Sequence, residues 1–336
     1  MKIREYLKLA RSFNAVLTGI SPVMGALVMQ HYSLLELIVL FFIGFLGHTW
    51  GFVLNDILDY KIDRHEKELK DRPLVSGTIS LRNAWLFAWT ALILAFILAL
   101  YLSVSKGLFF SLLVLVISAS FVTLYDLISK KLPLTDIILA LGVFFLVLYG
   151  ASIHLTSLNE VPLLAWIVCT LGAIQVLFMN IVAGGLKDID NDVQKGAKTL
   201  AVKLGVRVEH QHLHVSVSFF FVAYGIQIAD VILTFLPFVL FPLFTASWLC
   251  YIQWMLLIVI SGLMFFFSYK LLSLPTFDRD TVRKHIGLHY YTNFALVPVM
   301  LMTLTPWAIL LVFFPALGFV LSNLTLHGTL LQPKTM

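Results

Sequence analysis

Two acidic segments interrupt an otherwise apolar chain, and the first of them begins at Asn55. Asn55, Asp59 and Asp63 are spaced four residues apart, so on a helix they form one polar stripe, one above the other. Asp56 lies one step off this stripe, where it is either a cap or a further ligand. Clustered carboxylates repel one another and are costly next to lipid, so they need cations to remain ionised together. The pattern therefore predicts a site for divalent metal.

The second acidic segment repeats this pattern further along the chain. Asp188 and Asp192 share one helical face, Asp190 stands off that face, and Lys187 precedes all three. Two such stripes that face each other form one metal site, and the most plausible task of metal there is to hold phosphate. Mg²⁺ suits this task because it is usually bound by one or two carboxylates together with substrate phosphates and water.

Basic residues near both segments are candidates for sharing the charge of a leaving phosphate group. They are Arg72, Lys130, Lys187 and Lys198. Because the rest of the chain is lipid-like, we expect the other end of the substrate to be apolar as well. These residues together predict an isoprenoid diphosphate, with its head at the metals and its tail between helices.

The elements that position these residues are predicted to be membrane helices. Of the 336 residues, 60% are hydrophobic and only 12% are charged, whereas a soluble protein of this length needs more polar surface. Stretch 307–325 is either a tenth span or the far half of a kinked ninth, because Pro306 and Pro315 interrupt it. We expect one all-α membrane domain over residues 1–336. Apolar runs place the spans at 12–30, 33–54, 84–104, 107–125, 134–153, 161–182, 213–235, 249–270 and 289–306.

The distribution of positive charge predicts how the chain is oriented. Of the 23 Lys and Arg residues, 21 lie at the N-terminus or in alternate loops on one side. The other side holds Lys106, and with nine spans also Lys334. The positive-inside rule places that side, with the N-terminus and both acidic segments, in the cytoplasm. Four spans separate the two segments, so a two-fold-like repeat would set their stripes against each other across a central cavity.

Both acidic segments resemble the signatures of a known family, the UbiA superfamily of intramembrane prenyltransferases. The first signature is matched by Asn55-Asp56-x-x-Asp59-x-x-x-Asp63 followed by Arg72-Pro73-Leu74-x-Ser76-Gly77. The second is matched by Asp188-x-x-x-Asp192-x-x-x-Gly196-x-Lys198-Thr199. Weaker matches are Arg11-x-x-Asn14 ahead of the first span, and Tyr125 to Pro133 with Lys130 between them. The resemblance covers most of the chain in the right order.

The resemblance implies nine transmembrane helices around a central cavity and a Mg²⁺-dependent reaction. A prenyl group would pass from a polyprenyl diphosphate to an aromatic or lipid acceptor, with release of diphosphate, as in the 4-hydroxybenzoate or the archaeal ether-lipid branch. The implied metal ligands are Asn55, Asp56, Asp59, Asp63, Asp188 and Asp192. The implied diphosphate-binding residues are Asn55, Arg72, Lys130, Lys187, Lys198, Tyr125 and Asn14. The implied catalytic residues are Asp59, Asp63, Asp188, Asp192 and Arg72.

The chain departs from the family pattern at Gly185, where many members carry a further acidic residue, a charge that Asp190 is placed to supply. Two other classes of membrane protein also use acidic residues. A transporter needs them in mid-span, whereas here they lie at span ends beside basic residues. A CDP-alcohol phosphotransferase needs an arrangement of aspartates that this chain lacks. We expect a lipid bilayer and no nucleic acid among the partners.

Overall fold

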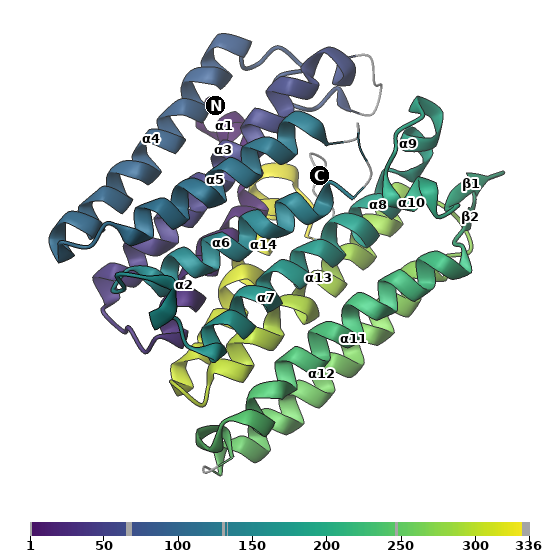
Figure 1. Ribbon diagram of the computed structural model, residues 1–336. Coiled ribbons are helices and arrows are strands. Elements are labelled where there is room, and N and C mark those ends of the chain that lie inside the picture. The colour runs from purple at the N-terminus through teal and green to yellow at the C-terminus, as the bar shows by residue number, and fades with distance from the viewer. Residues whose placement is uncertain (1, 65–68, 130–131, 133, 246–247, 331–336) are drawn as a thin grey trace. The chain divides into compact units, whose positions relative to one another are not determined.

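The computed structural model describes residues 2–64, 69–129, 132, 134–245 and 248–330, and nearly all of them are helical (Figure 1). Met179–Gly184 form a π-helical turn, and short 3₁₀ turns occur at Leu158–Glu160, Pro242–Phe244 and Pro306–Ile309. In chain order the elements are α1 (Lys2–Leu9), α2 (Ser12–Val28), α3 (Leu34–Asp63), α4 (Leu81–Lys106), α5 (Phe110–Ile128), α6 (Asp136–Ser152), α7 (Leu163–Phe178), α8 (Gly185–Lys187), α9 (Ile189–Lys195), α10 (Leu200–Lys203), β1 (Arg207–Glu209), β2 (His212–His214), α11 (Val217–Leu240), α12 (Leu249–Leu272), α13 (Arg279–Leu301) and α14 (Leu310–His327).

The chain forms two compact units, which we describe one at a time. Unit 1 comprises Met1–Leu127, Phe145–Ala165 and Phe314–Met336. Unit 2 comprises Ile128–Phe144 and Trp166–Phe313. The first acidic motif therefore belongs to unit 1, and the second belongs to unit 2. The prediction of a single domain over residues 1–336 stays a prediction.

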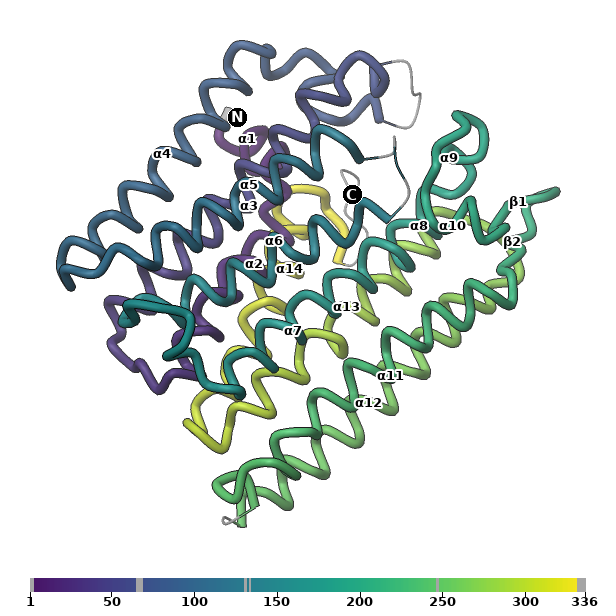
Figure 2. The backbone as a smooth tube through the Cα atoms, in the orientation of Figure 1, coloured from purple at the N-terminus to yellow at the C-terminus, as the bar shows by residue number. Residues whose placement is uncertain are grey.

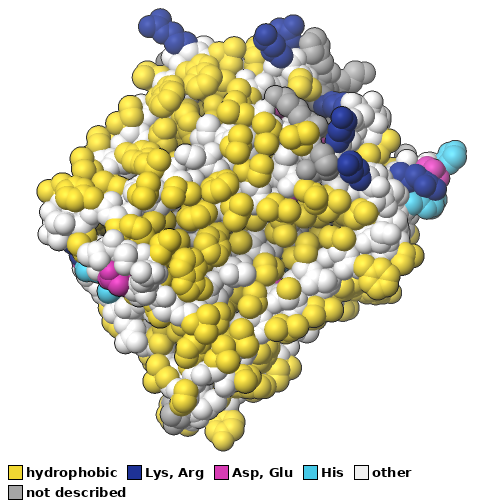
Figure 3. Space-filling model, in the orientation of Figure 1, with side chains coloured by type: hydrophobic (Ala, Val, Ile, Leu, Met, Phe, Trp, Pro, Cys, Tyr) yellow, Lys and Arg dark blue, Asp and Glu magenta, His cyan; other side chains and the backbone are white. Residues whose placement is uncertain are grey.

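Seven helical segments of the described chain are long and apolar enough to cross a membrane. Two further apolar helices, α2 and α6, are shorter. Hydrophobic side chains cover most of the face in Figure 3, and on α4 the exposed residues include Trp89, Ile93 and Ile97. A surface of this kind is suited to lipid rather than water. The seven segments are Leu34–Asp63, Leu81–Lys106, Phe110–Ile128, Leu163–Lys187, Val217–Leu240, Leu249–Leu272 and Pro306–His327.

These helices confirm the prediction of a helical membrane protein, while the total of nine or ten spans stays a prediction. The apolar stretch after Pro306 forms a helix of its own, α14, rather than an extension of α13. A small hairpin of β1 and β2 departs from the all-helical expectation, with Val208 paired to Leu213. At the hairpin tip His210 and Gln211 have φ values of 48° and 64°, as a tight turn between twisted strands favours. The span predicted to start at 213 therefore begins later, at Val217.

In unit 1, α2 packs against α3, and α3 packs against α4 (Figure 2). Glycines allow α2 and α6 to approach each other very closely. A Cβ at Gly25 would lie 2.0 Å from the carbonyl oxygen of Val147, and a Cβ at Gly150 would lie 1.7 Å from that of Pro22. Membrane helices associate through such small residues because lipid provides no hydrophobic drive between helices.

A charged cluster of unit 1 involves the connection between α2 and α3. Lys106 Nζ donates to Glu36 Oε1 at 2.6 Å, and His154 Nε2 lies 3.0 Å from Glu36 Oε2. The rings of His31 and His154 pack together with their centroids 4.0 Å apart. Burial, followed by the nearby charge of His154, lowers the pKa of His31 to about 4. Lys106, one of two cations outside the basic loops, thus has a carboxylate partner.

We expect Gly150→Ala to lower the free energy of unfolding of the detergent-solubilised protein by about 1–3 kcal/mol, because the new methyl group overlaps the Pro22 backbone. The matched control is Gly47→Ala in α3, where a Cβ would meet nothing within 4 Å. Thermal melts followed by circular dichroism measure both variants. Equal melting temperatures for the two would contradict the close contact of α2 with α6.

We expect the stability of unit 1 to depend on pH through His31. Its folded-state pKa of about 4 lies below the ordinary value of 6.5, so the unfolded chain binds the proton first as the pH falls. The stabilisation is therefore complete above pH 6.5 and is lost as the pH falls towards 4. Between pH 6.5 and 4, His31→Gln should reduce the change in the free energy of unfolding by roughly 1 kcal/mol. Partial exposure of the ring makes this amount smaller than the pKa shift alone would give. Melting temperatures across that pH range test the effect, with His210→Gln in the exposed hairpin as the control; parallel curves for wild type and His31→Gln would refute it.

Candidate functional site

The first acidic motif lies at the C-terminal end of α3, as the four-residue spacing predicted. Asn55, Asp56, Asp59 and Asp63 are all helical, and Asp63 is the last residue of the helix. Asp56 and Asp63 are each only 5% exposed. Apolar packing fixes this part of α3, because the same helix contributes Trp50, Val53, Leu54 and Ile57 to a buried cluster with Leu9, Leu74, Ile79, Ala84 and Ala88.

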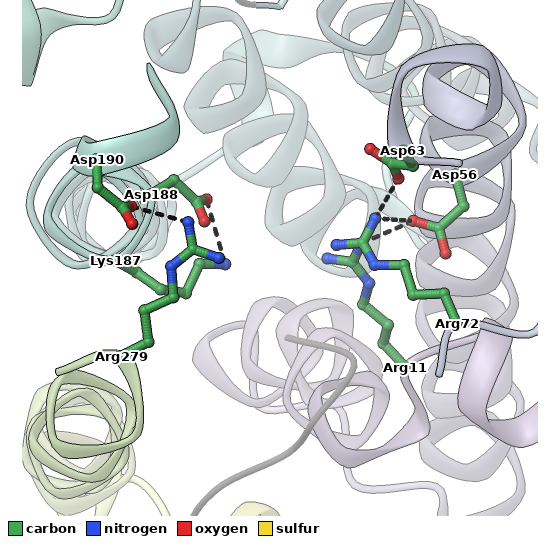
Figure 4. Close-up of polar contacts among 8 residues, drawn as sticks. All are labelled: Arg11, Asp56, Asp63, Arg72, Lys187, Asp188, Asp190 and Arg279. Carbon is green, nitrogen blue, oxygen red and sulfur yellow. Dashed lines mark hydrogen bonds and ion pairs between the residues drawn. The ribbon is translucent and has the colours of Figure 1, made fainter. Parts of the chain in front are cut away.

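Two arginines neutralise the buried carboxylates of this motif (Figure 4). Arg72 Nη1 donates to Asp63 Oδ2 at 2.5 Å and lies 3.4 Å from Asp56 Oδ1. Arg11 Nη2 donates to the same Asp56 oxygen at 2.7 Å. All four side chains are largely buried, so the bonds are strong and the loss of any partner is costly. Asp56, which lies off the predicted stripe, is the residue that both arginines bind.

A compact turn after α3 places Arg72 beside the end of that helix. The carbonyl oxygen of Pro73 accepts a hydrogen bond from the Ile79 amide at 3.1 Å, which closes the turn. Gly77 has φ of +74°, a conformation that glycine adopts without strain. Leu74 and Ile79 are buried in the cluster around Trp50. The Arg-Pro-Leu-x-Ser-Gly sequence therefore forms a turn that directs its arginine back to Asp63.

Arg11 is a partner of the motif that the sequence did not predict. It lies between α1 and α2 in the left-handed region, with φ of 45° and ψ of 48°. Its guanidinium carbon lies 4.8 Å from the ring centroid of Phe52, a cation–π contact that helps to orient it. Asn14, the predicted diphosphate-binding residue of α2, has a buried side-chain oxygen with no hydrogen-bond partner in the described part of the chain. The weak Arg11-x-x-Asn14 match was the signal for this region.

Helix α5 brings a further carboxylate, Asp126, to the first motif. Its side chain forms a hydrogen bond with Asn55 and lies near Asp59. Tyr125, a predicted diphosphate-binding residue, precedes it and is partly buried. Lys130, predicted from the same segment, lies outside the described residues. Asp126 has no sequence signal, because it stands apart from both acidic segments.

The second acidic motif, in unit 2, lies on an interrupted helix. After the π-helical turn, α8 ends at Lys187, and Asp188 has φ of −101° and ψ of 4° before α9 begins. Asp188 directly precedes α9 and Asp192 lies within it. The amide of Asp192 donates to the carbonyl oxygen of Asp188 at 2.9 Å, so the two residues are one helical turn apart, and a shared face for their side chains stays a prediction. The side chain of Asp188 is 45% exposed, whereas Asp192 is buried. π-Helical turns recur at functional sites and have no simple sequence period.

Cations also flank the second motif (Figure 4). Lys187 Nζ lies 3.4 Å from Asp188 Oδ2. Arg279 of α13 donates to Asp190 Oδ1 at 2.8 Å. The sequence missed Arg279, because 89 residues separate it from Asp190. Lys198 is exposed just before α10. The side chains of Lys187 and Asp190 thus lie close to partners of opposite charge, and the facing of the two motifs stays a prediction.

Gly185, the departure from the family pattern, has a packing role in unit 2. A Cβ at this position would lie 2.9 Å from the Cβ of Ala201, so α8 and α10 approach closely. An acidic side chain there would require one of these segments to move. The carboxylate of Asp190, which is placed to supply this charge, pairs with Arg279, and its part in the motif stays a prediction.

The donor atoms of the first motif fit Mg²⁺, which prefers hard oxygen ligands. Asn55, Asp59 and Asp126 provide such oxygens, and Asp126 Oδ2 is buried without a hydrogen-bond partner. Among the residues that the structure describes, no three His, Cys, Asp or Glu side chains form a ready-made metal cluster.

The fold and these motifs define a class of helical membrane proteins with aspartate-rich sites at helix ends. Residues 16–284 match the UbiA prenyltransferase family, and the chain belongs to that family. It belongs to neither the transporter class nor the CDP-alcohol phosphotransferase class considered as alternatives.

Individual relatives cover different shares of the chain. The digeranylgeranylglyceryl phosphate synthase of Methanocaldococcus jannaschii is 35% identical over 105 residues, which is 31% of this chain and only 36% of that protein. The protein of the same name from Thermococcus gammatolerans is 31% identical over 250 residues, or 70% of this chain and 79% of that protein. A solved UbiA homolog from Archaeoglobus fulgidus, bound to GPP and Mg²⁺, has a TM-score of 0.63 and 18% identity. The structural match covers 89% of this chain and 99% of the Archaeoglobus fulgidus chain. At 18% identity it shows that the two chains share a fold.

We expect Arg72→Ala to lower the free energy of unfolding by about 3 kcal/mol, because it leaves Asp63 buried without this cation. Adding Asp63→Asn to Arg72→Ala should recover part of the loss, since the buried charge that Arg72 had faced is removed. Denaturant titrations of the purified protein measure both variants, and Arg82→Ala, exposed at the start of α4, is the control. Strictly additive losses for the two changes would show that the pair does not interact.

Proposed function

We propose that the chain is a Mg²⁺-dependent intramembrane prenyltransferase that moves an isoprenyl group from a polyprenyl diphosphate to an acceptor and releases diphosphate. One observation carries this proposal: oxygen ligands and guanidinium donors meet in one buried cluster at the end of the apolar helix α3. Carboxylate oxygens suit the metal and guanidinium groups suit phosphate oxygens. The long apolar helices suit a lipid tail.

We assign the binding of Mg²⁺ to Asn55, Asp56, Asp59 and Asp63 of the first motif, and to Asp188 and Asp192 of the second. When bound, Mg²⁺ neutralises the diphosphate and makes it a better leaving group. Arg72, Lys187, Lys198 and Lys130 bind phosphate oxygens, with Tyr125 and Asn14 as further polar contacts. Arg72, Asp59, Asp63, Asp188 and Asp192 form the catalytic set.

In the reaction, the allylic C–O bond of the prenyl diphosphate breaks and its electron pair leaves with the diphosphate. A nucleophilic carbon or oxygen of the acceptor forms the new bond to the prenyl carbon, and the acceptor loses a proton. The surrounding apolar helices exclude water, which would otherwise capture the allylic cation. Arg72 binds the departing negative charge, held in place by the turn closed at Pro73.

The acceptor is proposed from the relatives and from the polarity of the site. The relatives from Methanocaldococcus jannaschii and Thermococcus gammatolerans are among those that carry the name digeranylgeranylglyceryl phosphate synthase, so a glyceryl phosphate lipid is the first acceptor to test. A hydroxylated aromatic acid is the second. The basic loops favour nine or ten spans with the N-terminus and both motifs at the cytoplasmic face.

We expect purified protein in lipid vesicles to release diphosphate from labelled geranyl or geranylgeranyl diphosphate when Mg²⁺ and a suitable acceptor are present. Chelation of the metal should abolish the release. Asp59→Ala and Asp188→Ala should each lower the rate by at least about 100-fold, since each removes an oxygen ligand of the metal.

The matched control is Glu209→Ala, which removes an exposed carboxylate in the hairpin and should leave the rate unchanged. Circular dichroism checks that each variant folds. Full transfer by Asp59→Ala or Asp188→Ala, or equal rates in excess chelator, would rule out the proposed function.

A further inference from the structure

Asp126 is a buried carboxylate beside the first motif that no signature of the sequence includes. It lies near the end of α5, and only 9% of it is exposed. Its side chain is hydrogen-bonded to Asn55, and Asp59, Arg11 and Asp56 lie close enough to act on its charge. A side chain of a neighbouring helix thus reaches the stripe of α3.

One carboxylate oxygen of Asp126 is hydrogen-bonded to Asn55, and the other has no hydrogen-bond partner in the described part of the chain. Oδ2 is fully buried without a partner in the described part of the chain, so the bond with Asn55 is made by Oδ1. Oδ2 lies 4.0 Å from the position of a Cβ at Gly51. A Cβ at Gly51 would also lie 2.9 Å from Cγ1 of Val122, so the glycine lets α5 bring Asp126 this close to α3.

The surroundings of this oxygen favour a cation. Asp59 and Asp56 are acidic, and Arg11 already binds Asp56. A buried carboxylate oxygen without a partner is costly, and neighbouring carboxylates add repulsion. A divalent cation would remove both costs. A carboxylate that binds Mg²⁺ is ionised and accepts hydrogen bonds only, so with the metal bound Asn55 would donate through its Nδ2, which leaves its amide oxygen for the metal.

We propose that Asp126 completes the oxygen ligands of the first motif, holding Asn55 through Oδ1 and binding Mg²⁺ through Oδ2, directly or through a water molecule. This inference rests on the proposed function and extends its metal site to α5. Asp126 is then both a ligand and the residue that fixes which way the Asn55 amide points.

The test measures metal binding without turnover. Full-length protein in detergent is titrated with Mg²⁺ at a fixed concentration of inorganic pyrophosphate, and the rise in melting temperature reports binding. For Asp126→Asn, which keeps an oxygen for Asn55, we expect the half-saturating Mg²⁺ concentration to rise at least about tenfold. Without Mg²⁺ this variant should melt at or above the wild-type temperature, because it removes a charge that Asp59 and Asp56 repel.

A purely structural role for Asp126 predicts the opposite pattern, namely a lower melting temperature without Mg²⁺ and unchanged affinity for the metal, and that result would overturn the inference. Asp126→Ala provides a second variant, which should show the same loss of affinity. The matched control is Asp230→Asn, the same change at a buried aspartate of α11 that is bonded to Gln175, and it should leave Mg²⁺ affinity as in wild type.

The same experiment separates this inference from the proposed function. One outcome refutes only the role of Asp126. In it, the melting temperature of wild type rises with Mg²⁺ and pyrophosphate, Asp59→Asn weakens that rise, and Asp126→Asn leaves it unchanged. If wild type shows no response at all, the proposed function fails together with it. A parallel titration with Ca²⁺ identifies whether the ligands select the smaller cation.

Discussion

A buried charged side chain needs a partner of opposite charge. At the end of α3 this requirement determines where two arginines of unit 1 lie. Asp56 and Asp63 are buried, so Arg11 and Arg72 have to reach them. Arg11 comes from the α1–α2 junction and Arg72 from the turn after α3. Both backbones adopt a conformation that serves this purpose, the left-handed one at Arg11 and the positive φ of Gly77. The local irregularities of the chain are therefore consequences of neutralising two aspartates.

Close helix packing supplies the rigidity that this arrangement needs. In a membrane, helices associate through small residues and hydrogen bonds rather than through exclusion of water. Trp50 Nε1 donates to Thr123 Oγ1 at 3.2 Å and ties α3 to α5. That bond lies one to two turns before Asn55 and just before Asp126, so it sets the register in which those two side chains meet.

The sequence predicted what depends on local spacing and missed what depends on distant contacts. The stripe of Asn55, Asp59 and Asp63 was predictable, because a four-residue spacing on a continuous helix has one geometric outcome. Arg11, Asp126 and Arg279 were not predicted, since tertiary packing brings them to the motifs from other elements. The π-helical turn Met179–Gly184 and the irregular backbone of Asp188 were also missed, because a π-helical turn has no characteristic composition. Membrane helices were recognisable from apolar length alone, whereas the shorter α2 and α6 leave the number of spans undecided by that criterion.

The contact between Gly185 and Ala201 links two positions that look independent in the sequence. With 2.9 Å between a Cβ at 185 and the methyl group of Ala201, any residue larger than glycine at 185 needs glycine at 201 or a displaced α10. The number of carboxylates in the second motif is therefore governed by steric fit as much as by electrostatics. An acidic residue at position 185 therefore needs a second substitution, Ala201→Gly, which removes the methyl group that would overlap the new side chain.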